Sequence, residues 1–437
     1  MITEALDKDI SAKINFIIST LEKNGHTAFL VGGCVRDLLL GLSPSDFDIT
    51  SSAKAEEIKR IFSDYKTIDT GLKYGTVTLI IDKMPFEITT FRKNEKYLDF
   101  RRPKKLEFSN NIEDDLTRRD FTINAIACHL DGKILDPFFG KTDLKNRIIR
   151  CVGDPDKRFE EDALRILRAL RFSSVLDFEI EKDTKNSIIK NKDLLLKISK
   201  ERITSEIKKL ICGKAATKII KNYFEVFCVL FPKLRETENF IPKSSHHSES
   251  VLTHCLKVMD NLPKTVEFQI VGLFHDISKP NLKRNHSKNS SEIADDILTE
   301  YKFDYKTKNK ICDLIECHDL IIPKDEVLLN KFIKDLGVEL FLSLLTFRKA
   351  DILGQRKEYY YRLKDLSQIE ENSKKIIKSS VLKISDLNID GNDLKALKIS
   401  DKKIGYYLDL LLNAVIEHKV ENEKSKLMKY VLDQHKR

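Results

Sequence analysis

The sequence predicts an α+β protein, with an N-terminal head built on a mixed or antiparallel sheet and a long helical body after it. Short apolar segments typical of strands lie at 28–31, 47–50, 76–81 and 86–91. From Glu160 onward this strand pattern fades, and the apolar residues recur at helical spacing almost throughout. Strands gathered at one end and helices at the other are typical of the α+β class.

Local signals support the individual elements of the head. A helix is predicted over 9–24, because Ile14, Ile17, Ile18 and Leu21 fall on one face. Residues 82–85 suit a hairpin between the third and fourth strands, and Asp131-Gly132 suits a second hairpin turn. Polar, turn-rich text predicts loops at 242–250 and 283–291.

Composition narrows the class of protein. The 437 residues are enough for two to four domains, and 41% hydrophobic with 33% charged residues is typical of a soluble chain. The apolar runs are too short to span a bilayer, and the polar residues 1–9 do not resemble a signal segment. The eight cysteines include no Cys-x-x-Cys pair, so we expect reduced thiols and a cytoplasmic location. The net charge of +9 permits a nucleic-acid partner, but lysine-rich composition alone explains it equally well.

The stretch 30–50 carries the most informative chemistry in the chain. Gly32 and Gly33 leave backbone open to a phosphate at the start of a predicted helix. Asp46 and Asp48 stand two residues apart in a predicted strand, which places both carboxylates on one face, about 6–7 Å apart along it. Such a pair could hold one or two Mg²⁺ ions, although a lone Asp-x-Asp is usually a solvated turn or a cap.

In its order and spacing, the set Gly32, Gly33, Arg36, Asp37, Asp46 and Asp48 resembles the first motif of the class II nucleotidyltransferases, the tRNA CCA-adding enzymes and bacterial poly(A) polymerases. The resemblance implies that Asp46 and Asp48 are the catalytic Mg²⁺ ligands. It also implies that Gly33 and Arg36 contact the nucleotide.

Arg118-Arg119-Asp120 resembles the second motif of this family. Arginine suits phosphate because its planar fork donates several charge-assisted hydrogen bonds. The resemblance implies that Arg119 and Asp120 contact the phosphates and ribose of the incoming nucleotide; the alternative is a surface salt-bridge cluster. The stretch 136–144 resembles the third motif, for which we expect a hinge and packing role.

A fourth motif, Glu-Asp-x-x-Arg, is present at 161–165 and is followed by Arg168 and Arg171. Asp162, Arg165 and these two arginines recur every three residues, which predicts that one helical face carries all four. An Asp and an Arg held side by side present acceptors and donors that could read a base edge, and the resemblance implies that they select CTP and ATP without a template. The alternative is ordinary ion pairing within a helix.

The stretch 92–108 is unusually basic and includes Arg101, Arg102, Lys104 and Lys105. In the family, a flexible loop here helps switch specificity from C to A, but these residues could equally form a solvated surface.

A second constellation lies between residues 246 and 351. It comprises His254, the adjacent His275 and Asp276, His286, His318 and Asp351, with His246 and His247 nearby. Imidazole and carboxylate suit divalent transition metals, and the ordered set resembles the binuclear HD phosphohydrolases. The resemblance implies a metal-activated water that attacks phosphate, although HD domains also persist as structural modules.

Together the motifs predict a Mg²⁺-dependent tRNA nucleotidyltransferase that adds CCA from CTP and ATP, releases pyrophosphate and has no membrane partner. We expect a nucleotidyltransferase head at 1–150, an all-α neck for nucleotide selection and RNA binding at 151–240, an HD metal-binding domain at 241–370 and a helical tRNA-binding tail at 371–437. The alternatives are an A-adding enzyme or poly(A) polymerase, a protein that is chiefly an HD phosphohydrolase acting on RNA phosphates, and a non-catalytic RNA-binding protein.

Overall fold

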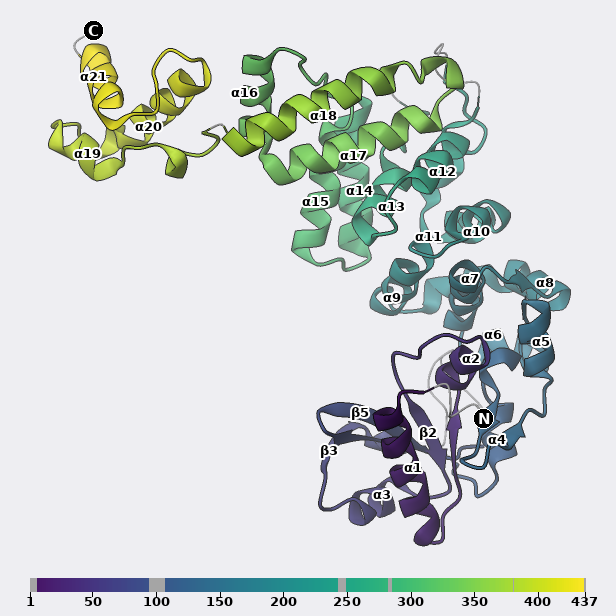
Figure 1. Ribbon diagram of the computed structural model, residues 1–437. Coiled ribbons are helices and arrows are strands. Elements are labelled where there is room, and N and C mark those ends of the chain that lie inside the picture. Colours follow the sequence, from purple (N-terminus) through teal and green to yellow (C-terminus); the bar gives the residue numbers. More distant parts are fainter. Residues whose placement is uncertain (1–5, 94–106, 243–248, 282–284, 380, 436–437) are drawn as a thin grey trace. The chain divides into compact units, whose positions relative to one another are not determined.

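The computed structural model describes residues 6–93, 107–242, 249–281, 285–379 and 381–435. The chain divides into two compact units, Met1–Pro232 and Lys233–Arg437 (Figure 1). The predicted domain boundaries at 150, 240 and 370 stay predictions. None of the helices within the described ranges is long and apolar enough to cross a lipid bilayer.

Within the described ranges, the first unit is built on a seven-stranded mixed sheet with the strand order β3-β4-β5-β2-β1-β6-β7. Strand β2 pairs with β5 in parallel, and the other neighbours pair antiparallel. This mixed sheet confirms the predicted fold class. Its strands are β1 (Ala28–Val31), β2 (Asp48–Ser51), β3 (Lys66–Gly71), β4 (Thr76–Ile81), β5 (Met84–Thr90), β6 (Ala127–Cys128) and β7 (Ile134–Leu135).

Both predicted hairpins are confirmed. Asp82 and Lys83 turn between β4 and β5 with φ of 49° and 68°, the left-handed pair typical of a tight hairpin turn. Gly132, at φ 82°, turns between β6 and β7. The predicted first helix is also confirmed as α1 (Lys8–Lys23), whose buried face packs with α3 (Ala55–Ile61) beside the sheet.

Three strands are missing from the sequence prediction. Strand β3 lies at the sheet edge with a register shift after Ile68, whose side chain is exposed, so it lacks the alternation of a half-buried strand. Strands β8 (Ile148–Ile149) and β9 (Glu179–Ile180) form a separate parallel pair. Two residues are too short for any periodicity to show.

The remaining helices of the first unit lie between its strands and after them, and several carry the arginine-rich motifs. They are α2 (Gly33–Leu39), α4 (Ile112–Thr117), α5 (Gly140–Asn146), α6 (Pro155–Glu161), α7 (Leu164–Leu176), α8 (Lys182–Asn191), α9 (Lys200–Ile211), α10 (Ala216–Asn222) and α11 (Phe224–Leu230). Helix α7 packs closely on α9, which brings two arginine-bearing segments together.

The second unit is helical within the described ranges, as predicted. Its helices are α12 (Val251–Asn261), α13 (Val266–Phe274), α14 (His286–Glu300), α15 (Tyr305–Cys317), α16 (Glu326–Leu336), α17 (Val338–Gly354), α18 (Arg362–Ser379), α19 (Gly391–Ala396), α20 (Asp401–Ile416) and α21 (Lys424–His435). The predicted loop at 283–291 is wrong from His286 onward, where α14 begins. The last three helices share an apolar cluster centred on Leu394, Leu411 and Leu427.

Candidate functional sites

The turn before α2 brings a carboxylate and an arginine together in the first unit. Gly32 has φ 81° and ψ −136°, a conformation open mainly to glycine. A Cβ at Gly32 would lie 3.0 Å from Nη1 of Arg119 and 3.7 Å from Oδ2 of Asp48. Glycine here therefore allows the backbone to approach both side chains, and Gly33 follows as the first residue of α2.

The two predicted catalytic carboxylates differ in environment. Asp48 opens β2, whereas Asp46 lies in the exposed bend before it, so the prediction that both stand on one strand is wrong. Burial raises the pKa of Asp48 to about 6; Arg119 acts against this rise, and Glu87 and Asp46 add to it. Glu87 is the partner of Asp48 in the β2–β5 register, and sequence reasoning missed it. Its place between buried Phe86 and Ile88 could have signalled that it faces the other way, toward the site.

Arg119 pairs with the buried carboxylate of Asp115. Its Nη2 lies 3.1 Å from Oδ2 of Asp115, which is fully buried and also pairs with Arg118 at 2.5 Å. The Nε of Arg119 is buried without a hydrogen-bond partner among the described residues. Asp115, which the sequence analysis did not single out, therefore fixes the arginine that faces Asp48.

Asp120 is buried, and protein groups bind both of its carboxylate oxygens. Its Oδ1 accepts hydrogen bonds from the Phe121 backbone N–H and the Asn124 amide, and its Oδ2 accepts one from Nε of Arg168 at 2.7 Å. Burial acts to raise the pKa of Asp120, but Arg168 and Arg165 outweigh it and lower the pKa to about 2. The structure gives Asp120 a positioning role toward Arg168, and a contact with ribose stays a prediction.

The prediction that one helical face carries Asp162, Arg165, Arg168 and Arg171 is wrong for Asp162. Helix α6 ends at Glu161, Asp162 is extended at φ −148°, and α7 begins only at Leu164. The carboxylate of Asp162 accepts from the Leu164 N–H at 3.1 Å, so it closes a local turn just before α7 instead of lying within a helix.

The ion pairs of this motif also differ from the expected Asp162–Arg165 pair. Asp162 binds both terminal nitrogens of Arg202 on α9, at 2.7 and 3.2 Å. Arg165 instead donates to Oε2 of Glu161 at 2.6 Å and to the carbonyl of Arg118 at 3.0 Å. Each member of the predicted base-reading pair is thus held in place by a residue other than its expected partner.

Three predicted nucleotide-binding arginines gather over one aromatic ring. The guanidinium carbons of Arg36, Arg168 and Arg171 lie 5.1, 5.4 and 4.2 Å from the ring centroid of Phe172. Arg171 also pairs with Glu206 on α9 at 3.0 Å. Such a concentration of positive charge favours a polyanion such as a triphosphate.

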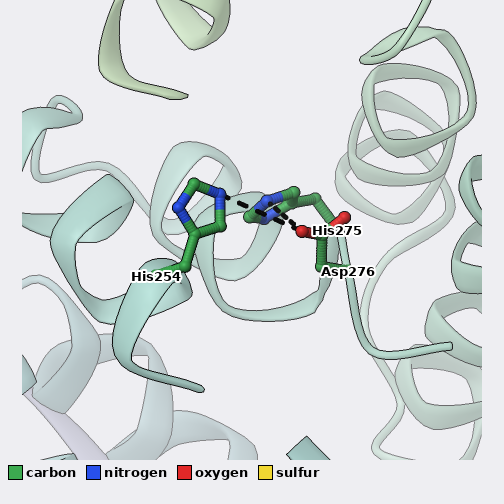
Figure 2. Close-up of side chains that lie close together, drawn as sticks. All are labelled: His254, His275 and Asp276. Atoms are coloured by element: carbon green, nitrogen blue, oxygen red, sulfur yellow. Dashed lines mark ion pairs between the residues drawn. The ribbon is translucent and has the colours of Figure 1, made fainter. Parts of the chain in front are cut away.

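The predicted histidines and aspartates of the second unit do meet, in the interior of its helical bundle. His254 comes from α12, His275 and Asp276 follow α13, His286 opens α14, His318 follows α15 and Asp351 lies on α17. Figure 2 shows His254, His275 and Asp276 pointing toward one another. Among these residues, all but His286 are buried.

Asp276 lies at the centre of this cluster. Its Oδ2 is 3.3 Å from Nε2 of His275 and 3.9 Å from Nε2 of His254, and its Oδ1 is 3.4 Å from His286 and 3.6 Å from His318. Two groups of candidate metal ligands therefore share one carboxylate. Asp351 belongs to neither group but lies 3.1 Å from Nε2 of His254.

The chemistry of the cluster suits a divalent transition metal. His275 Nε2, Asp276 Oδ1 and His286 Nε2 are buried without a hydrogen-bond partner among the described residues, as metal-ligating atoms would be in the absence of the ion. Nδ1 of His275 lies 3.0 Å from the Gly272 carbonyl, which leaves Nε2 as the free ligand atom.

The pKa shifts in the cluster favour the protonation states in which most of its members can bind a metal. Burial lowers the pKa of both His275 and His286, which keeps the imidazoles neutral. Burial acts to raise the pKa of Asp276, but His275 and Lys279 hold it well below the usual range. Burial acts to lower the pKa of His254, but the hydrogen bond to Asp351 raises it overall.

Two sets of predicted residues cannot be placed. Arg101, Arg102, Lys104 and Lys105 of the basic segment lie outside the described residues, as do His246 and His247.

Comparison with known proteins identifies the family. The family model described as "Poly A polymerase head domain" matches residues 28–150. A model for an RNA- and SrmB-binding site of polymerase A matches 177–237, and a model for domain 2 of tRNA nucleotidyltransferases matches 286–431. The CCA-adding enzyme of Lactobacillus helveticus is 35% identical over 435 residues, covering 97% of this chain and 98% of that relative. The CCA-adding enzyme of Ligilactobacillus salivarius is 51% identical over 269 residues, covering 61% of this chain and 66% of that relative.

A solved structure agrees with these sequence matches. The Bacillus stearothermophilus CCA-adding enzyme in complex with CTP superimposes with a TM-score of 0.71 at 29% identity, covering 97% of both chains. Since the near-full-length matches are to CCA-adding enzymes, the chain belongs to the CCA-adding enzyme family of tRNA nucleotidyltransferases.

Proposed function

We propose that this chain builds the CCA end of tRNA from CTP and ATP without a template, at the site around Asp48 in the first unit. The observation that carries the proposal is the meeting of Gly32, Asp48 and Arg119, where backbone, carboxylate and guanidinium converge. In the reaction, the 3′-hydroxyl of the tRNA gives up its proton to solvent and its oxygen bonds to the α-phosphorus. The bond between the α-phosphorus and the α–β bridging oxygen breaks, and pyrophosphate leaves with that oxygen.

Asp46 and Asp48 would hold Mg²⁺ at this site. The raised pKa of Asp48, beside Glu87 and Asp46, supports this assignment, because a bound cation would relieve the repulsion among these carboxylates. When bound, Mg²⁺ supplies charge stabilisation of the reacting phosphate and of the attacking oxygen.

The arginines of the chain would bind and orient the nucleotide. Arg119, fixed by Asp115, faces the carboxylates, and the cluster of Arg36, Arg168 and Arg171 over Phe172 would bind the triphosphate. Asp162 and Arg165 would read the base; their fixed positions support selection without a template, because a rigid donor–acceptor edge can stand in for a pairing base.

A staged incorporation assay tests the proposal. With tRNA that ends before the CCA sequence, we expect incorporation of labelled CTP alone, and incorporation of ATP only after two C residues. Incorporation of ATP without CTP would contradict CCA addition and favour an A-adding enzyme or a poly(A) polymerase. Asp46→Ala should abolish both incorporations, and unchanged activity in this variant would contradict the role of Asp46. Wild-type protein that incorporates neither nucleotide would instead favour an RNA-binding protein without catalysis.

A second function, hydrolysis of RNA phosphate esters, is favoured by the unpartnered metal-ligand atoms of the His/Asp cluster. His254, His275, Asp276, His286 and His318 would hold the metal, which when bound supplies an activated water. In the hydrolysis, the water oxygen bonds to phosphorus, the ester P–O bond breaks, and the leaving oxygen takes up a proton. Metal analysis together with a phosphodiesterase assay on wild type tests this function, and wild-type protein without metal or without hydrolysis would contradict it.

The proposed reactions place the protein with tRNA in the cytoplasm, where we expect it to act. Residues 371–437 stay the predicted tRNA-binding tail.

A further inference from the structure

The His/Asp cluster opens onto a cavity that two arginines also line. The cavity encloses about 330 Å³, and His275, Asp276 and Asp351 line it together with Arg348, Gln355 and Arg362. The first three belong to the cluster described above. The last three come from α17, from its C-terminal end and from the start of α18, and the proposed metal binding does not account for them.

Arg348 is anchored to the cluster through the backbone. Its Nη1 donates to the carbonyl of His318 at 2.9 Å, and its side chain is only 14% exposed. The same nitrogen lies 4.0 Å from the exposed Asp319, too far for a hydrogen bond. A guanidinium has five N–H donors in a planar fork, so an anchor on one of them orients the others toward the cavity.

Arg362 is connected to the cluster by a chain of hydrogen bonds. The Oδ2 of Asp351 accepts from Nε2 of Gln355 at 3.1 Å, and the Oε1 of Gln355 accepts from Nη1 of Arg362 at 3.1 Å. Asp351 in turn contacts His254 through its other oxygen. The position of Arg362 is therefore coupled to the geometry of the cluster.

The charge balance of the cavity points to an anion. Among the described residues, Lys279, Arg348 and Arg362 offset Asp276, Asp319 and Asp351 in its wall. Each divalent ion bound by the histidines adds two positive charges to this neutral lining. Because arginine matches the oxygens of a phosphoryl group in a two-pronged contact, phosphate is the anion that suits the wall best.

We propose that Arg348 and Arg362 bind the non-bridging oxygens of a substrate phosphoryl group beside the His/Asp cluster, and that Gln355 positions Arg362. The proposal rests on the metal-dependent phosphohydrolase function proposed above. The substrate must be a phosphate ester whose phosphoryl group carries negative charge and can reach the cavity.

Binding of inorganic phosphate to the full-length, metal-loaded protein tests the proposal by calorimetry. We expect Arg348→Gln and Arg362→Gln each to raise the Kd for phosphate by about tenfold or more, since a charge-assisted hydrogen bond is lost in each. Gln355→Leu should raise it less, and Arg362→Lys should restore part of the affinity. Arg356→Gln is the matched control, because Arg356 lies in the same turn, is half exposed and is absent from the described cavity wall.

Metal content separates the two proposals. Variants that keep wild-type metal content but show an unchanged Kd for phosphate would overturn the anion site while leaving the metal site in place. Wild-type protein that binds no metal would contradict the metal site; phosphate binding that still depended on Arg348 and Arg362 would then support the anion site, and absence of phosphate binding would overturn both. Activity is measured with a ribonucleoside 2′,3′-cyclic phosphate and with a 3′-monophosphate. For both substrates the variants should raise KM more than they lower kcat. The ester whose KM rises more is the better match to the site.

Discussion

The carboxylate site of the first unit and the His/Asp cluster of the second unit, which we propose both act on phosphate, have opposite designs. The carboxylates Asp46 and Asp48 come from one short segment, and Asp46 is exposed. The cluster draws its members from five helices, over nearly a hundred residues, and buries almost all of them. Oxygen ligands in an open site suit Mg²⁺, which keeps several waters and arrives with its nucleotide; buried imidazoles suit a resident transition metal.

This difference indicates how each site is stabilised without its ion. In the first unit, Arg119 lies next to the carboxylates and offsets part of their charge. In the second unit, buried ligand atoms are left without hydrogen bonds, and a lasting metal would compensate for their desolvation. The two sites should therefore respond independently to substitution.

Removal of the half-buried Asp48 carboxylate should break the first site completely. We expect Asp48→Asn to lower the rate of nucleotide addition by at least about 10³-fold, because loss of a metal ligand removes several kcal/mol of transition-state stabilisation. The measurement is single-turnover CTP incorporation into tRNA. The metal content of the second unit should not change; a parallel loss of metal there would contradict the independence of the two sites.

Removal of a cluster histidine is the matching test in the second unit. His275→Ala should weaken metal binding by at least about a hundredfold, since even partners outside the ligand set are worth 10- to 100-fold in affinity. Metal titration and the phosphodiesterase assay measure this loss. CTP incorporation should persist, and its disappearance would show that the cluster serves nucleotide addition after all.

The contrast also explains what could be predicted from the sequence. Gly32, Asp48, Arg119 and the cluster histidines lie in ordered motifs, so the family resemblance was enough to find them. The partners that hold other predicted residues, Glu206 for Arg171 and Arg202 for Asp162, act through contacts that only the folded chain creates. No local pattern marks such contacts.

The misplaced Asp162 has a local cause. The spacing rule assumed one continuous helix through the motif, but the Asp162 carboxylate bonds to the N–H of Leu164 and so competes with the helical backbone. Aspartate commonly closes such local turns, so the signal was present in the sequence but was outweighed by the periodicity of the arginines.

Two glycine-to-alanine substitutions, one in each unit, compare backbone strain at the first site with crowding at the cluster. Gly32→Ala should cost about 2 kcal/mol of unfolding free energy, because φ 81° with ψ −136° strains any L-residue. Its Cβ would also push on Arg119. Gly354→Ala, beside His254, should also cost about 2 kcal/mol, but through crowding, because its Cβ would lie 2.8 Å from the buried, β-branched Val258 side chain.

Denaturant unfolding measures both variants. Because the two glycines lie in separate units, a probe placed in each unit should report only its own substitution. A larger loss for Gly354→Ala than for Gly32→Ala would show that crowding at the cluster exceeds strain at the turn.

The smallest expected effect concerns nucleotide selection, and it tests whether the first site depends on fixed side chains as the cluster does. Arg202→Gln removes the two-pronged partner of Asp162, whose side chain is about one-fifth exposed. With its carboxylate no longer held, the preference for CTP over UTP should fall by about tenfold, the loss expected for one charge-assisted hydrogen bond. Arg147→Gln is the control, because Arg147 pairs with Asp177 on an exposed surface of the same unit. A purely structural role for Arg202 would lower the melting temperature and leave the CTP/UTP ratio unchanged, and that result would remove Asp162 from base selection.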